Sequence, residues 1–128
     1  MPDEAAVLAT LRKICLALPE VVETVTFGHP TFRAGKRPFA VLETYGGELS
    51  LALGVGQDRQ EVLLEDTCIY RTPYVGHRGW VSLRVGGTID WGLVRDLVDA
   101  SYRRVALGRM LKTLDREKPS DLAPSQGR

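Results

Sequence analysis

The sequence contains few of the residues from which metal and disulfide centres are built. Its 128 residues include only two cysteines and two histidines. Cys15 and Cys68 lie far apart and form no C-x-x-C motif, which favours reduced, buried thiols over a disulfide framework or a zinc site. Two histidines without a carboxylate or thiolate at helical spacing are too few for a metal centre. We therefore expect neither a disulfide nor a bound metal.

The sequence also lacks long hydrophobic runs and an excess of one charge. Its apolar runs are short, and the opening Met-Pro-Asp-Glu is not typical of a signal peptide, so we expect no membrane span, no export signal and a cytoplasmic protein. Seventeen Lys and Arg oppose sixteen Asp and Glu, which gives a net charge of +1. Because the field of the whole molecule is weak, any electrostatic function must lie in a local patch.

Common catalytic motifs are missing as well. The chain contains no Walker A, H-E-x-x-H or G-x-S-x-G string. Gly54-Val-Gly56 resembles the start of a dinucleotide loop, but Arg59 occupies the third glycine position, so we predict a simple strand-to-helix turn. We therefore expect a non-enzymatic protein without a cofactor. An enzyme would require His29 or His77 to have a carboxylate partner.

Length and hydrophobic spacing predict one α+β domain. With 44% hydrophobic residues, 128 residues suffice for a single core. Apolar side chains recur at helical spacing over residues 3–18 and again after Asp90, which is a good N-cap for a second long helix. Gly108 is expected to end that second helix, and a short helix over residues 109–116 follows it.

The segments between the two long helices have the composition of β-strands. Strand-like runs fill much of residues 21–53, with tight turns at 34–37 and 46–47, and continue at 67–71 and 80–85. Short turns imply antiparallel neighbours. The order helix, strands, helix predicts a two-layer sandwich in which the N-terminal and C-terminal helices pack on one face of an antiparallel sheet.

We assign residues 1–116 to this domain and residues 117–128 to a disordered tail, because the tail is polar and interrupted by proline. Aromatic side chains are expected to pack first of all in the core, namely those of Phe27, Phe32, Phe39, Trp80 and Trp91.

Charge is distributed unevenly along the chain. Residues 1–66 carry −4 and residues 67–128 carry +5, and two windows, 24–42 and 67–89, contain no acid. Each window places basic and aromatic residues together on a predicted hairpin or loop, which suits contact with a nucleic-acid backbone. Solvated hairpin tips are an equally good explanation of such residues. The candidate phosphate contacts are Arg33, Lys36, Arg37, Arg71, Arg78 and Arg84.

A small-molecule pocket is the alternative function. The two Gly-His strings could meet at a site lined by His29, Phe32, Tyr74, His77 and Trp80. Such a pocket needs apolar walls and a few convergent polar groups. The plainer explanation of His29 is a structural one, in which its ring nitrogens tie the first hairpin. His77 is expected to be exposed. The outer cations of the second long helix and its successor, including Arg104, are expected to form a solvated face.

Four strings of the chain resemble the MmcQ/YjbR family: Cys15-Leu-Ala-Leu-Pro19, Phe27-Gly-His-Pro-Thr-Phe-Arg33, Tyr74-Val-Gly-His-Arg-Gly-Trp-Val81 and Asp99-Ala-Ser-Tyr-Arg-Arg-Val-Ala106. The resemblance covers about residues 7–115 and implies a CyaY-like, that is frataxin-like, fold. It also implies binding of double-stranded DNA through two wings, here residues 33–37 and 71–78. Frataxin-type iron handling would need an acidic ridge where Arg12 and Lys13 lie, so we expect no iron site.

Overall fold

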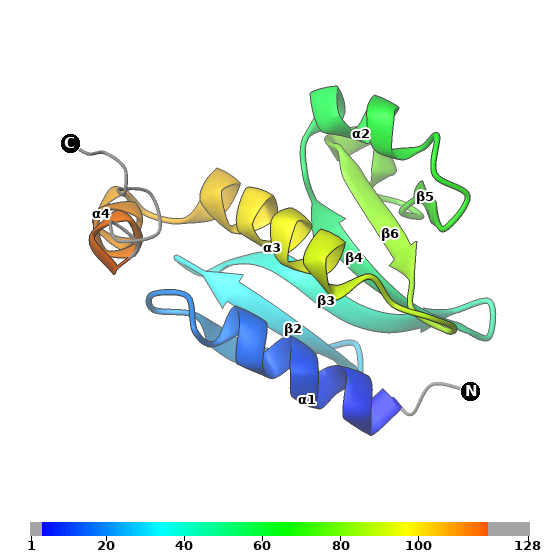
Figure 1. The fold of residues 1–128 in the computed structure, drawn as a ribbon, viewed down its shortest axis with the longest axis horizontal. Coiled ribbons are helices and arrows are strands. Elements are labelled where there is room, and N and C mark those ends of the chain that lie inside the picture. The colour runs from blue at the N-terminus through cyan, green and yellow to red at the C-terminus, as the bar shows by residue number, and fades with distance from the viewer. Residues whose placement is uncertain (1–3, 118–128) are drawn as a thin grey trace.

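The computed structural model describes residues 4–117 and is built around a six-stranded antiparallel sheet (Figure 1). The order across the sheet is β1-β2-β3-β4-β6-β5, so the first four strands form successive hairpins and β5 is an edge strand outside β6. The strands are β1 (Val22–Thr26), β2 (His29–Ala34), β3 (Arg37–Tyr45), β4 (Glu48–Gly54), β5 (Ile69–Arg71) and β6 (Trp80–Arg84).

Two long helices cover one face of this sheet. In Figure 1, α1 (Glu4–Cys15) crosses in front of β2, and α3 (Trp91–Val105) crosses in front of β3 and β4. The shorter helices are α2 (Gln57–Leu63), the 3₁₀ helix η1 (Gly76–Arg78) and α4 (Gly108–Glu117). This arrangement confirms the predicted α+β two-layer sandwich. No helix within residues 4–117 has the length and apolar character needed to span a membrane.

The hydrophobic core lies between the sheet and the helices. Alternate residues of β3 and β4 point toward the helices, among them Leu42 and Leu53, which are fully buried. The predicted helical stripes supply the other half of the core, with Leu11 of α1 and Leu97 of α3. Asp90 caps α3 as predicted, because its carboxylate accepts a hydrogen bond from the Leu93 amide at 3.1 Å.

Three hairpins have two-residue turns in which both residues have positive φ, as in type I′ turns. Their turn residues are 27–28, 35–36 and 46–47. The second and third were predicted from glycine. The first turn joins β1 to β2 and places Phe27, with φ 51°, at its tip.

Three expected helix boundaries are wrong. The first helix was expected over residues 3–18, but α1 ends at Cys15, where the Leu18 amide bonds the Cys15 carbonyl in a turn. Helix α3 ends at Val105 because Ala106 is extended (φ −64°, ψ 146°), and Gly108 begins α4 instead of ending α3. Glu117, which was assigned to the tail, is the last residue of α4. Position 3 and the rest of the predicted tail, 118–128, lie outside the described residues.

Three expected burial assignments are also wrong. Trp80 was assigned to the core, but it alternates with the core residue Val81 on β6 and is therefore half-buried on the opposite face of the sheet. Cys15 is fully buried as predicted, but Cys68 is exposed because it lies in the turn before β5. Phe27 was assigned to the core and is instead 96% exposed. Because Phe27 lies in the two-residue turn between β1 and β2, its ring has almost no neighbours in the core and stays exposed.

Candidate functional site

A cleft of about 620 Å³ opens beside the end of β4, where the sheet face that points away from the helices adjoins the last turn of α3. Its floor includes Val41, Ala52 and Trp80. On β3 and β4, Val41 and Ala52 alternate with the core residues and therefore point to the opposite face. Phe27 contributes one wall from the β1–β2 turn, and Tyr74 contributes another from the segment 72–79.

Trp80 can lie against the end of β4 because position 54 has no side chain. A Cβ atom on Gly54 would come within 2.9 Å of the indole ring. Gly54 also ends β4, and α2 begins at Gln57, so the Gly54-Val-Gly56 string is the predicted strand-to-helix turn. Its glycines thus serve close packing and a positive φ of 96° at Gly56.

The segment 72–79, which carries Tyr74 and Arg78, is held firmly by α2. The Gln60 side chain is 2% exposed, and its Nε2 donates to the carbonyls of Gly76 at 2.6 Å and Trp80 at 3.0 Å. Its Oε1 accepts from Arg71 Nη1 at 2.8 Å. A buried amide with all these partners fixes the loop, because leaving it unpaired would cost about 1–3 kcal/mol.

Gly79 provides the second attachment of this segment. Its carbonyl accepts hydrogen bonds from the amides of Val55 at 3.1 Å and Gly56 at 3.0 Å. Gly79 has φ 88°, and a Cβ there would lie 2.6 Å from the Gly56 carbonyl carbon. Only glycine fits this approach, so the backbone of the loop is positioned before any ligand arrives.

Three arginines from separate elements line the cleft: Arg37 at the start of β3, Arg78 in η1 and Arg104 near the end of α3. Within residues 4–117, none of them forms an ion pair with a carboxylate. Glu43 is the one acidic residue among the described residues of the lining. The cleft therefore has an excess of positive charge that is not neutralised internally.

Arg104 is exposed, as expected of the solvated helix face, but its guanidinium also contacts the end of β4. Its Nη1 donates to the Gly54 carbonyl at 3.2 Å, and its guanidinium passes close to Gly56. The neighbouring Ser101 hydroxyl accepts from the Gly54 amide at 3.0 Å and donates to the Phe39 carbonyl at 2.6 Å. These contacts fix the end of α3 against β4 and bring Arg104 to the cleft.

Two of the six predicted phosphate contacts, Arg37 and Arg78, line the cleft, so each acid-free window contributes a cation to this surface. Lys36 is exposed at the tip next to Arg37. Arg33 is occupied within its own hairpins, because it donates to the hydroxyls of Thr24 and Thr26 and to the Lys36 carbonyl. Arg71 is held by Gln60, as described above.

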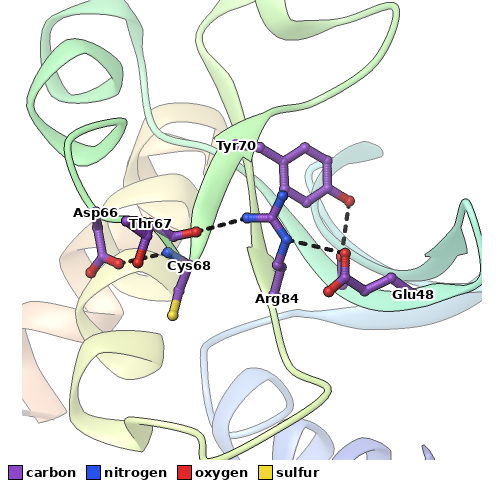
Figure 2. A network of polar contacts seen from close by, with 7 residues as sticks. Glu48, Asp66, Thr67, Cys68, Tyr70 and Arg84 are labelled. Atoms are coloured by element: carbon purple, nitrogen blue, oxygen red, sulfur yellow. Dashed lines mark hydrogen bonds and ion pairs between the residues drawn. The ribbon is translucent and has the colours of Figure 1, made fainter.

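Arg84, the sixth candidate, is bound within a separate network (Figure 2). Its Nε pairs with Glu48 at 3.1 Å, and its Nη1 donates to the Thr67 carbonyl at 2.9 Å. Its guanidinium also lies 4.6 Å from the centre of the Tyr70 ring, and Tyr70 in turn hydrogen-bonds Ser50 at 2.9 Å. These contacts give Arg84 a structural role in joining β4, β5 and β6.

The five residues proposed for a small-molecule pocket do not come together. Tyr74 and Trp80 line the cleft, whereas Phe32 is fully buried in the core and is not a wall residue. His77 is exposed and borders a separate hollow beside α2. The His29 ring, expected to tie the first hairpin, makes no hydrogen bond to any of residues 4–117. The two Gly-His strings therefore do not form one site.

Sequence reasoning missed Phe27, Glu43 and Arg104 as cleft residues. Phe27 had a detectable signal, because an aromatic residue followed by glycine between two strand-like runs is a possible turn. Arg104 had none, since its position depends on how α3 docks. Elsewhere, no group of three or more His, Cys, Asp or Glu side chains within residues 4–117 has the geometry of a metal site.

The fold has solved counterparts. A Deinococcus radiodurans protein with the DUF419 domain is 26% identical and has a TM-score of 0.69, and the match covers 86% of each chain. A Pseudomonas syringae protein solved by structural genomics is 14% identical with a TM-score of 0.62, and the match covers 82% of this chain and 99% of the other. No curated protein matches the sequence. The YjbR family model matches residues 16–104, which is most of the chain, and the protein therefore belongs to the YjbR family.

Proposed function

We propose that this protein is a non-enzymatic nucleic-acid-binding domain that contacts phosphates through the cleft. The observation that carries the proposal is that Arg37 and Arg78, one from each acid-free window, line the same cleft without a carboxylate partner among the described residues. Unpaired guanidinium groups present fixed donors that match phosphate oxygens. Lys36 and Arg104 extend the basic surface along the tip of β2–β3 and the end of α3.

Binding of this kind derives its free energy mainly from the release of counterions. If Arg37, Arg78 and Arg104 each neutralise one phosphate, log K falls against log salt with a slope of about −2.7 for duplex DNA. Affinity then drops about 40-fold between 50 and 200 mM salt. No base edge is read in such contacts, so we expect little sequence preference.

The test is a fluorescence-anisotropy titration of a labelled random-sequence DNA duplex at these two salt concentrations. The double variant Arg37→Gln/Arg78→Gln should reduce the slope to about −0.9, because one phosphate contact remains. A slope that is unchanged in the double variant would refute the assignment of the phosphate contacts.

A matched control removes the same charge elsewhere. Arg95 and Arg116 are exposed on α3 and α4, outside the cleft, and form no ion pair within residues 4–117. The variant Arg95→Gln/Arg116→Gln should keep the wild-type slope. An equal decrease of the salt slope in both double variants would show that the net charge of the protein, and not the cleft, determines affinity.

A small anionic ligand is the second candidate, because the cleft volume of about 620 Å³ lies within the range of small-molecule pockets. Trp80 in the floor provides the reporter, once Trp91 is replaced by Phe. Saturable quenching by adenosine monophosphate without any duplex binding at 50 mM salt would select this candidate. Duplex binding with the predicted salt slope would exclude it as the main function.

A further inference from the structure

We infer that the cleft binds unpaired, single-stranded nucleic acid in preference to a duplex, with bases stacked on Phe27 and Tyr74. This inference rests on the proposed function and specifies its partner. Both rings line the cleft, and they are 96% and 90% exposed. Rings exposed to this degree add almost nothing to the core, so packing does not explain their presence.

The backbone at these two residues supports the inference independently. Phe27 has φ 51° and Tyr74 has φ 69°, both in the left-handed region that bulky residues rarely adopt. A type I′ turn favours Asn-Gly, yet the chain has Phe27-Gly28. Each aromatic residue therefore occupies a position where a small polar residue would be more stable. Residues in such unfavourable conformations concentrate at binding sites.

The chemistry of the cleft distinguishes a single strand from a duplex. In a duplex the base faces are stacked on each other and only the groove edges and phosphates are accessible. A single strand exposes the base faces, which stack on aromatic rings regardless of sequence. Arg37 and Arg78 lie along the same cleft as the two rings, so phosphates and bases of one strand can be engaged together.

Trp80 adds a third aromatic surface to the same cleft. It is half-buried and held against Gly54, which keeps its ring fixed in the floor. The carboxylate of Glu43 also lines the cleft and disfavours a phosphate at its position, so the strand must place sugar or base there. The arrangement fits a short strand whose phosphates follow the arginines.

The experiment compares a labelled 12-nucleotide strand, made as DNA and as RNA, with the 12-base-pair DNA duplex under the same salt conditions. We expect at least one single strand to bind about tenfold more tightly than the duplex. The DNA and RNA forms show which sugar is preferred. Phe27→Asn/Tyr74→Asn should weaken single-strand binding about tenfold or more and weaken duplex binding by a clearly smaller factor, because a duplex offers neither ring a free base face.

Two controls keep the result specific to stacking. Val25 is 71% exposed on β1 and lies outside the cleft, so Val25→Asn removes exposed apolar surface away from the two rings and should leave single-strand affinity unchanged. Phe27→Tyr retains the ring and should keep the affinity. Because Phe27 and Tyr74 are exposed, thermal melting of the double Asn variant should show an intact fold.

The failure of this inference differs from the failure of the proposed function. A duplex that binds as tightly as either single strand, and loses affinity in Arg37→Gln/Arg78→Gln, overturns the single-strand preference and leaves phosphate binding intact. An equal loss of affinity for the single strand and for the duplex in Phe27→Asn/Tyr74→Asn also overturns the single-strand preference. Absence of binding by any oligonucleotide at 50 mM salt overturns both proposals.

Discussion

Replacing Phe27 with Asn should stabilise the protein. Phe27 occupies the first position of a two-residue turn and has φ 51°. The left-handed conformation costs an ordinary residue about 1 kcal/mol, and Asn tolerates it better because its side chain forms local hydrogen bonds. Asn followed by Gly28 also creates the sequence that type I′ turns favour most.

The loss from removing the ring is small. Phe27 is 96% exposed, so very little of its surface is buried against the rest of the chain. For an aromatic side chain of about 200 Å² that remainder is roughly 8 Å², which is worth about 0.2 kcal/mol. The net gain in the free energy of unfolding is therefore up to about 0.8 kcal/mol, equivalent to a rise in Tm of up to about 3 °C.

Urea denaturation followed by tryptophan fluorescence measures this change, with the slope of the linear extrapolation as a check that both proteins unfold alike. Phe27→Ala is the control, because alanine loses the ring without gaining tolerance of positive φ, and it should not stabilise. A decrease of 1 kcal/mol or more in Phe27→Asn would refute the reasoning, because it would show that the ring stabilises the fold by packing.

Three further outcomes are expected. Glu43→Gln removes the acidic group of the cleft and should tighten binding of an oligonucleotide a few-fold in anisotropy titrations. Burial raises the pKa of the Cys15 thiol, so a thiol reagent should label only the exposed Cys68 until the protein is denatured, in a mass-spectrometric count. The hydrogen bond from Arg109 lowers the pKa of the Glu20 carboxyl, so this pair stabilises the fold above the ordinary glutamate pKa and loses its effect as the pH falls. Arg109→Gln should thus lower stability at pH 7 and leave it unchanged below about pH 3 in urea titrations.

Much of the fold follows from local patterns in the sequence. Helical spacing identified the buried faces of α1 and α3, and Asp90 was identified as a cap because an acidic side chain precedes the apolar stripe. Glycine marked two of the three hairpin turns. These features depend on neighbouring residues only, so they are visible without knowledge of the tertiary structure.

The remaining features depend on contacts between distant segments. Gly108 suggested a helix end, but α3 stops earlier because Ala106 leaves the helical conformation. From the sequence, Arg84 and Arg37 were equally good candidates for phosphate contacts. Only the structure shows that Arg84 is bound by Glu48 and the Thr67 carbonyl. Arg104 enters the cleft because Ser101 docks α3 onto the ends of β3 and β4. The pairing of distant strands and the packing of α3 on the sheet decide where these arginines lie, and no local sequence pattern encodes either.

Within segment 72–79, the backbone and the side chains have different roles. The backbone attaches the segment to Gln60 and to the turn at Gly56, and the side chains of Tyr74 and Arg78 line the cleft. The carbonyls of Gly76 and Gly79 hold the backbone in place. The side chains of Tyr74 and Arg78 take no part in that attachment. Natural variation or a designed library at positions 74 and 78 can therefore change what the cleft recognises on an unchanged scaffold, in the manner of an exchangeable antibody loop.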